Sequence, residues 1–255
     1  MGSCSDYNKI LKGSDYEKKY QAAVAYYEEG DYFKSSTLLE ELLTVYKGTK
    51  RAEEIYYYYA FSQYGLLDFD FAAFHFRNYV KNFSKSERVE EVSYMIALCY
   101  FKLSAKPSLD QKNTMKALKE FQLFLDKYPN TERVADVNEK VDILRGKLET
   151  KSFNLAFLYY KTGYYKSAII AFNNLLKDYP DIENSDEAHY YIVKSNYELA
   201  KLSVESKMKS RFEETVEAGR VFMRKYPTNK KYSKEVEQII EDSKKEISKL
   251  NINNI

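Results

Sequence analysis

The sequence predicts an all-α protein, an α-α superhelix of five helix pairs that ends in a C-terminal capping helix. One observation is a recurring helix stop: Tyr128-Pro129, Tyr179-Pro180 and Tyr226-Pro227 each follow an amphipathic stretch, and proline does not continue a helix. The stops recur at a spacing of roughly fifty residues, which is typical of helical repeats. Composition agrees, because only 8 Gly and 4 Pro among 255 residues favour helices joined by short connections. Stacked repeats usually work by offering a surface.

Charge and apolar patterning exclude several classes of function. The 40 basic and 38 acidic residues leave a net charge of only +2, and no sustained basic face is present, so no nucleic acid is expected as a partner. No apolar run approaches the roughly 20 residues that span a bilayer. The 26 tyrosines suit a repeat array, since a tyrosine ring packs between helices while its hydroxyl reaches water.

Small and aromatic residues recur at fixed offsets in the predicted pairs. In the clearest copy Ala156 lies in the first helix, Gly163 in the turn, and Ala168 and Phe172 in the second helix. This is the tetratricopeptide pattern, in which small residues let two helices approach and large ones fill the space between repeats. We therefore expect five tetratricopeptide-like helix pairs. Two further copies keep the same spacings: Ala60, Ala72 and Phe76, and, with weaker residues, Ala23, Ser35 and Leu39.

Two copies depart from the regular spacing. Eight residues are inserted in the third copy, around 106–114, where Pro107 ends one helix and Asn113 or Thr114 can cap the next. A long helix near 132–161 then leads into the fourth pair. The fifth pair is expected at 187–199 and 212–226, with a longer connection near 203–210 and Gly219 in place of an aromatic residue. A charged amphipathic helix at 233–250 is expected to cover the last apolar face.

No catalytic or metal-binding constellation is recognisable in the sequence. The two histidines, His75 and His189, belong to no zinc pattern, and there is no glycine-rich phosphate loop. Adjacent carboxylates such as Glu40-Glu41 point to different sides of a helix and are interpreted as solvated faces. We therefore expect no enzyme activity, no catalytic residue, no metal and no cofactor. Cys99 is expected to be inert core, whereas Cys4 precedes a polar stretch.

The first helix of each pair is expected to line the concave side of the array. The positions that face this groove are mostly aromatic in the amino-terminal half, and such a stripe suits an extended peptide with aromatic side chains. The alternative interpretation is that several of these rings only pack on the neighbouring repeat. The candidate partner-binding residues are Tyr20, Tyr27, Tyr57, Phe61, Tyr64, Tyr94 and Phe101.

Three stretches carry a resemblance to a known family. They are Cys4-Ser5-Asp6 with its polar lead-in, the inserted segment Pro107-x-x-Asp110-Gln111-x-x-Thr114 with Tyr128-Pro129-Asn130-Thr131 after it, and Phe157-x-Tyr159-Tyr160 with Tyr179-Pro180-Asp181. Together they resemble the BamD family, tetratricopeptide-repeat lipoproteins of the outer-membrane β-barrel assembly machine. The resemblance covers about residues 4 to 230.

The resemblance implies a function and a location. Members of this family are acylated on their first cysteine, for which only Cys4 fits, and are anchored at the periplasmic face of the outer membrane. Their carboxy-terminal repeats dock on the periplasmic domains of the barrel-forming assembly subunit. Their amino-terminal half is linked to recognition of carboxy-terminal signals on unfolded outer-membrane proteins, and other assembly lipoproteins are further candidate partners. The chain is thus expected to be a non-catalytic outer-membrane protein assembly factor.

The expected organisation is a short leader followed by one repeat domain. Residues 1–13 are expected to hold an artificial leader, Met1-Gly2-Ser3, and the lipid-anchor lead-in. Residues 14–250 are expected to form a single tetratricopeptide-repeat domain, with repeats at about 16–48, 53–85, 90–131, 149–182 and 187–229 and a cap at 233–250. The alternative function is another adaptor scaffold with tetratricopeptide repeats, periplasmic or cytosolic. A lipoprotein cleavage site directly before Cys4 would separate the two.

Overall fold

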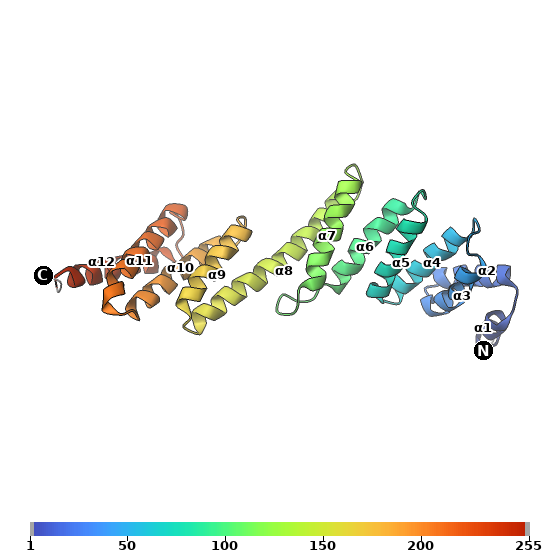
Figure 1. Cartoon of the computed structure of the whole chain (residues 1–255), viewed down its shortest axis with the longest axis horizontal. Helices are drawn as coiled ribbons and strands as arrows, with labels where there is room; N and C mark the ends of the chain where they lie inside the picture. The colour runs from blue at the N-terminus through green and yellow to red at the C-terminus, as the bar shows by residue number, and fades with distance from the viewer. Residues whose placement is uncertain (1–2, 253–255) are drawn as a thin grey trace. The chain divides into compact units, whose positions relative to one another are not determined.

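The structure is a computed structural model that describes residues 3–252, with side chains from residue 6 onward. Within this range helices alternate with turns and short loops, and no strand occurs (Figure 1). The predicted all-α, tetratricopeptide-like fold is confirmed. The described helices are α1 (Ser3–Lys12), α2 (Tyr16–Glu28), α3 (Tyr32–Val45), α4 (Ala52–Gly65), α5 (Phe69–Asn82), α6 (Val89–Leu103), α7 (Lys112–Lys127), α8 (Val134–Lys161), α9 (Tyr165–Asp178), α10 (Ser185–Lys201), α11 (Glu205–Lys225) and α12 (Ser233–Ile252).

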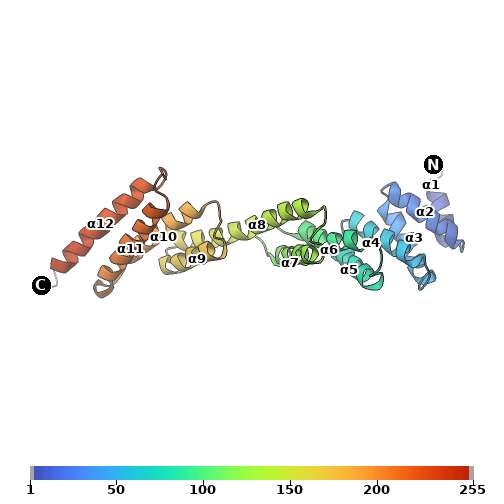
Figure 2. The same ribbon diagram turned by 90° about the horizontal axis from the view of Figure 1, so that it is seen from above.

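Two compact units divide the described chain: unit 1 reaches Arg145 and unit 2 begins at Gly146. In unit 1, α2 packs on α3, α4 on α5 and α6 on α7, and each pair also contacts the next. In unit 2, α9 packs on α10, α10 on α11 and α11 on α12. Figure 2 shows α10, α11 and α12 lying side by side. The expected single domain, with its repeat and cap boundaries, stays a prediction.

Small residues lie where the two helices of a pair approach each other. Each of them is fully buried, so a larger side chain would push the helices apart. Phe76, Phe121 and Phe172 on the second helices are also fully buried and fill the space between helices. Burial of one such ring is worth about 1.5–3 kcal/mol. The alanines are Ala23, Ala60, Ala72, Ala97 and Ala117 in unit 1 and Ala156 and Ala168 in unit 2.

The turns within pairs require a left-handed residue. Gly30 and Gly163 adopt φ values of 79° and 80° at equivalent places, where glycine has no steric penalty. Leu67 takes the same place in the second pair, with φ 63°, a conformation that a branched side chain disfavours. The next helix then begins at an aspartate: Asp31 and Asp68 cap α3 and α5 by accepting backbone N–H groups at 3.2 Å.

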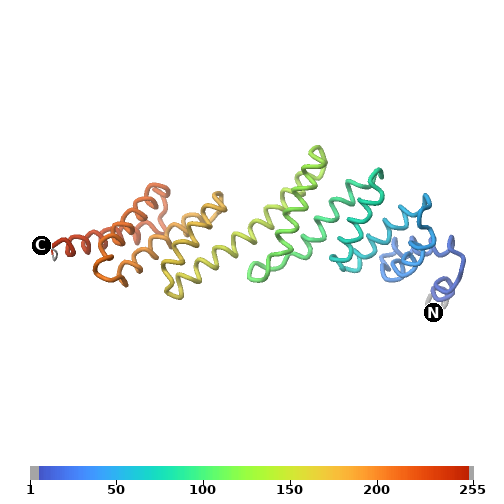
Figure 3. The backbone as a smooth tube through the Cα atoms, viewed as in Figure 1, coloured from blue at the N-terminus to red at the C-terminus, as the bar shows by residue number. Residues whose placement is uncertain are grey.

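The long helix expected near 132–161 is present as α8, and Figure 3 traces it without interruption. Its first part buries Val137 and Leu144 against the core of unit 1. Its last part buries Ala156 in the core of unit 2, where it forms the first helix of the fourth pair. One helix therefore supplies apolar surface to both cores.

The inserted segment of the third pair is capped by a residue that the sequence reading did not choose. We expected Asn113 or Thr114 at the cap, but the cap position is held by Gln111, two or three residues earlier, and α7 begins at Lys112. The buried Gln111 amide donates to the carbonyl oxygens of Lys106 and Leu109, at 2.8 and 3.1 Å, and its oxygen accepts from Thr114 at 2.7 Å. The glutamine folds back over the inserted loop, so its contacts with the carbonyl groups of that loop accompany the start of the helix.

The fifth pair also differs from expectation. The second helix, α11, begins at Glu205 and not at Phe212, so the expected connection near 203–210 is wrong and the turn is short. The structure also explains Gly219. A Cβ atom built there would lie 2.6 Å from Cγ1 of Ile240 on α12, so the glycine permits the close approach of the terminal helix.

The lead-in is helical, where the sequence suggested only a polar segment. Tyr7, Ile10 and Leu11 on α1 pack against the core of the first repeat. Lys19 is only 1% exposed, and its Nζ donates to the carbonyl oxygen of Leu11 at 3.0 Å and to Glu41 at 2.5 Å. A buried lysine thus fastens the end of α1 to the repeat array. Cys4 lies within α1, but its side chain is outside the described part of the chain.

Candidate protein-interaction surface

The seven candidate partner-binding residues all lie on first helices of pairs in unit 1. Six of them are half-buried, and Tyr94 is only 6% exposed. Their role in binding stays a prediction, because their placement shows packing and partial exposure only. Tyr20 and Tyr27 lie on α2, Tyr57, Phe61 and Tyr64 on α4, and Tyr94 and Phe101 on α6.

The rings of α4 form an aromatic cluster with each other and with α5. The ring centres of Tyr57 and Phe61 are 4.4 Å apart, and Phe61 meets Phe76 at 4.9 Å. Tyr64 meets Phe69 at 5.2 Å. Aromatic pairs contribute about 0.5–1.5 kcal/mol beyond their area burial. These rings therefore stabilise their own repeat as well as forming part of a candidate binding surface.

Tyr57 also joins its repeat to the next one. Its hydroxyl donates to Glu91 at 3.1 Å, and the guanidinium carbon of Arg88 lies 4.5 Å from the centre of its ring. Both partners come from the start of α6. We call this arrangement the junction clasp: a ring on one first helix, with an arginine and a carboxylate from the start of the next first helix.

The junction clasp recurs on both sides of Tyr57. Tyr94 donates to Asp136 at 2.6 Å under the guanidinium of Arg133, 4.6 Å from the ring centre. Tyr20 has Arg51 at 4.9 Å, with Glu54 in hydrogen-bond contact. In the clasps of Tyr20 and Tyr57 the arginine follows the tyrosine by 31 residues and the carboxylate follows it by 34. In the clasp of Tyr94 both spacings are longer by the eight inserted residues.

Burial and the clasp carboxylates keep these phenols protonated. Burial, followed by the nearby carboxylate, raises the pKa of Tyr20, Tyr57 and Tyr94 well above the ordinary value of a phenol. Burial opposes ionisation of Asp136, but hydrogen bonds from Lys140 and Tyr94 outweigh it and lower the pKa of that carboxyl. At neutral pH the tyrosines therefore act as hydrogen-bond donors to charged acceptors.

The aromatic stripe continues in unit 2, which the sequence reading missed. Tyr57, Phe61 and Tyr64 lie at fixed offsets from Ala60 in their first helix. The same offsets from Ala156 give Phe153, Phe157 and Tyr160 as the groove positions of α8. Phe157 and Tyr160 both pack on Tyr191 of α10, at 4.9 and 5.0 Å. The signal was present in the sequence, since the fourth copy matches the pattern best.

The fifth pair carries a variant of the junction clasp. Tyr190 on α10 donates to Glu235 of α12 at 2.6 Å, and Lys194 pairs with the same carboxylate at 2.9 Å. Tyr232 stacks on Tyr190 at 4.2 Å, in the place that an arginine takes in unit 1. Burial, followed by the hydrogen bond to Glu235, raises the pKa of Tyr190 to about 12.

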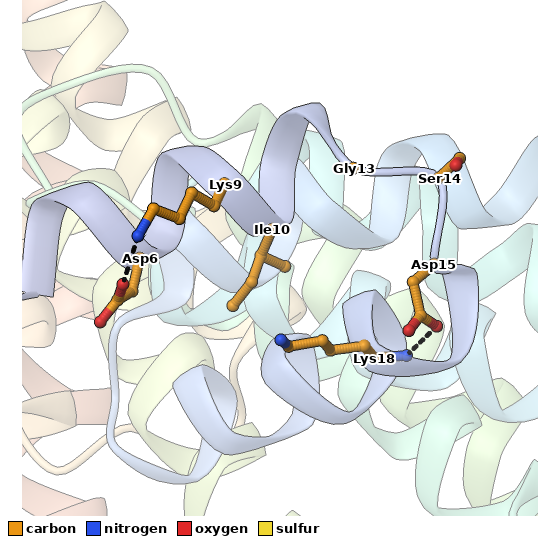
Figure 4. Close-up of a pocket in the computed structure, with 7 residues that line it drawn as sticks. All are labelled: Asp6, Lys9, Ile10, Gly13, Ser14, Asp15 and Lys18. Atoms are coloured by element: carbon orange, nitrogen blue, oxygen red, sulfur yellow. Dashed lines mark hydrogen bonds and ion pairs between the residues drawn. The ribbon is translucent and has the colours of Figure 1, made fainter.

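A surface hollow lined by polar and charged residues lies near the amino terminus. Figure 4 shows it between α1 and the start of α2, with a volume of about 580 Å³. Among its charged groups, Lys9 pairs with Asp6 at 3.5 Å, and Asp15 accepts the backbone N–H of Lys18 at 3.0 Å as the cap of α2.

The two histidines lie in separate surroundings. His75 Nδ1 is 3.0 Å from the hydroxyl of Tyr56, and His189 Nδ1 is 2.8 Å from the carbonyl oxygen of Ser185. Burial lowers the pKa of both imidazoles. In the part of the chain that the structure describes, no group of three or more His, Cys, Asp or Glu residues is placed to hold a metal ion. No described helix is both long and apolar enough to cross a membrane.

Comparison with known proteins gives a family match along most of the chain. The profile of the YfiO family, described as outer membrane lipoprotein, matches residues 13–211 and, in a second match, residues 152–254. These ranges include every described helix from α2 to α12.

The chain is also similar to proteins named outer membrane protein assembly factor BamD. The protein of Caulobacter vibrioides is 28% identical over 102 residues, which cover 40% of this chain and 33% of the relative. The protein of Rickettsia prowazekii is 29% identical over 102 residues, which cover 40% of this chain and 41% of the relative. A protein of Aquifex aeolicus, provisionally given the same name, is 22% identical over 197 residues, which cover 76% of this chain and 64% of the relative. The matched part of this chain thus spans between about a third and two thirds of these relatives.

Proposed function

The chain belongs to the YfiO family of outer membrane lipoproteins, and from this premise we propose that it is a non-catalytic scaffold in the assembly of outer-membrane proteins. The observation that carries the proposal is the family match across the helix pairs of both units. Relatives named as assembly factors support it. In this role the repeats hold other polypeptides in place, which is the usual work of such arrays.

The first helices of unit 1 provide the proposed surface for unfolded clients. Tyr27 and Tyr64 are half-buried, so each ring keeps an exposed edge above a packed base. Tyr27 packs on Tyr58 at 5.1 Å, and Tyr64 packs on Phe69 at 5.2 Å. Because these rings are already ordered, little side-chain entropy is lost when they bind an aromatic residue of a carboxy-terminal signal.

The remaining parts of the proposal concern the assembly subunit and the membrane. The repeats of unit 2 dock on the periplasmic domains of the barrel-forming subunit, and lipid on Cys4 holds the protein at the periplasmic face of the outer membrane. Each buried methylene contributes about 0.8 kcal/mol, so more than one acyl chain is needed for stable anchoring. The docked α1, fastened by Lys19, supports a short and ordered connection from the anchor to the first repeat.

Copurification tests the assembly role. The tagged lipoprotein, extracted from outer membranes, is expected to bring down the barrel-forming subunit. A Cys4→Ser variant is expected to leave the membrane fraction while still binding that subunit in solution. Recovery of the lipoprotein without the subunit, under conditions that keep the assembly machine intact, would contradict the proposal.

A peptide titration tests the client surface. The probe is a labelled carboxy-terminal peptide of an outer-membrane barrel protein that ends in an aromatic residue. Tyr64→Leu and Tyr27→Leu are each expected to weaken binding about five- to thirtyfold, since an aromatic anchor contributes about 1–2 kcal/mol. Tyr164→Leu in unit 2, where the ring is 65% exposed, is the matched control and is expected to change nothing. Unchanged affinity in folded Tyr27 and Tyr64 variants would refute this surface.

A further inference from the structure

The fourth repeat junction departs from the junction clasp of unit 1. At the ring position α8 carries Phe153, which has no hydroxyl, and Asn184 stands where the clasps have an arginine. The spacing from Phe153 to Asn184 equals that from Tyr57 to Arg88, so the positions correspond. The chain therefore supplies a ring at this junction but no arginine to cover it.

The missing arginine leaves a hollow that reaches the ring. A cavity of about 360 Å³ within unit 2 is lined by Phe153 and Asn184 together with neighbouring residues of α8 and of the turn before α10. The second and third junctions also have hollows, of about 450 and 720 Å³, at the start of their first helices. Those hollows are lined by Arg88 and Arg133, and the tyrosines beneath are not among their lining residues. Only at the fourth junction, among these three, does the aromatic ring form part of the wall.

The wall of this hollow is also negatively charged. Glu149 of α8 is half-buried, Glu183 in the turn is exposed, and both line the cavity. The hollow therefore combines an aromatic face, like the rings that Arg88 and Arg133 cover in unit 1, with carboxylates that can pair with a guanidinium.

We infer that this hollow receives an arginine side chain from a partner polypeptide. The guanidinium is planar, so it stacks on the ring of Phe153 while its N–H groups pair with Glu149 or Glu183. The template lies in the same chain: Arg88 and Arg133 occupy this place over Tyr57 and Tyr94, with guanidinium carbons 4.5 and 4.6 Å from the ring centres. The partner completes in trans the contact that unit 1 makes in cis. This inference does not rest on the assembly role.

The first test uses the unaltered protein and two short peptides. An acetylated and amidated Gly-Arg-Gly peptide is titrated at millimolar concentration, and the resonances of the Phe153 ring and the Asn184 amide are followed by NMR. The same peptide with citrulline keeps the shape of arginine but removes its charge. Shifts at Phe153 and Asn184 are expected with arginine, with at least about threefold weaker binding for citrulline. Equal shifts with both peptides, or none with arginine, would overturn the inference.

Two variants separate the hollow from the general charge of unit 2. Asn184→Arg places an arginine at the clasp position, so it is expected to abolish the shifts of Phe153 and to raise the thermal unfolding midpoint. Asn173→Arg makes the same chemical change at an exposed site of α9 and is expected to leave binding intact. Equal effects of the two variants would overturn the inference. Phe153→Leu is expected to weaken binding about threefold to tenfold while the helical content is kept.

Discussion

The two units place rings at the same positions of their first helices and secure them with different chemistry. In unit 1, Tyr57 and Tyr94 are each held by a carboxylate and covered by an arginine of the next first helix. In unit 2, Phe153 has no hydroxyl and Asn184 stands at the arginine place, although Glu187 stands at the carboxylate place, and Tyr190 is covered by Tyr232 in place of an arginine. The positions of the rings in the first helices are therefore common to both units, whereas the residues that contact each ring differ from junction to junction.

That difference separates two roles of an aromatic residue in a repeat array. A ring whose hydroxyl is bound and whose face is covered mainly stabilises the junction. A ring that lies in the wall of a hollow remains available to another molecule. Substitutions at four sites, ordered by expected effect, test what stabilises the repeats of the two units.

Tyr94 tests how much a clasp stabilises unit 1. Tyr94→Ala removes a ring that is 6% exposed and packs on Phe124 at 5.8 Å; the expected loss is about 3–5 kcal/mol of unfolding free energy. Tyr94→Phe removes only the hydroxyl that donates to Asp136 and is expected to cost about 1.5–3 kcal/mol. Denaturant unfolding followed by circular dichroism measures both. A Tyr94→Phe variant as stable as the parent would show that the hydroxyl does not secure the junction.

Gly65 tests the close approach between the first two pairs of unit 1. A Cβ atom there would lie 2.5 Å from Cγ and Cε2 of Tyr32, so Gly65→Ala must displace that ring. The expected loss is about 1–3 kcal/mol. Gly146→Ala in α8 is the matched control: nothing lies within 4 Å of its Cβ, and alanine is expected to stabilise the helix by about 0.5–1 kcal/mol. Thermal unfolding that moved the same way in both variants would contradict this account.

Leu67 tests the turn that both units share. Its φ of 63° is unfavourable for leucine, and its side chain is 70% exposed. Leu67→Gly is therefore expected to stabilise unit 1 by about 1 kcal/mol. Gly163→Ala makes the reverse change in unit 2, at φ 80°, and is expected to destabilise by about as much. The measurement is the shift in the thermal midpoint, and a less stable Leu67→Gly variant would disprove strain at this turn.

His75 is expected to give the smallest effect, through pH. Burial lowers the pKa of its imidazole in the folded state, so as the pH falls below about 6.5 the unfolded chain binds a proton that the folded chain does not. Stability is thus full above that pH and declines below it. The groups facing the imidazole are rings, with Tyr56 at Nδ1 and Tyr59 at 4.9 Å. In urea titrations across pH 5–8, His75→Gln is expected to reduce the fall in unfolding free energy at low pH. An unchanged dependence of unfolding free energy on pH would argue against a contribution from His75.

Some elements were predictable from the sequence and others were missed. The buried alanines, the turn glycines and the long α8 were predictable, because periodicity and turn residues act over a few positions. The early start of α11 was missed because 205–211 is polar and lacks an apolar stripe, although it consists largely of helix-forming residues. The cap of α7 was missed because Gln111 is held at that position by hydrogen bonds from its side-chain amide to carbonyl groups of the preceding loop.

The candidate site divides in the same way. Sequence spacing correctly placed the seven aromatic residues of unit 1 on first helices, and the same spacing would have found Phe153 and Tyr160. It did not reveal that Tyr57 is covered by Arg88, or that the ring of Phe153 lies in the wall of a hollow.

By itself the sequence determined most of the helices, their pairing and the positions of the rings, because each depends on residues that are neighbours along the chain or across one turn of helix. Only the tertiary structure decided which rings are covered and which are open. The partners of a ring are more than thirty residues away, and they meet it only once successive first helices have stacked, so their contact depends on packing that no local pattern specifies.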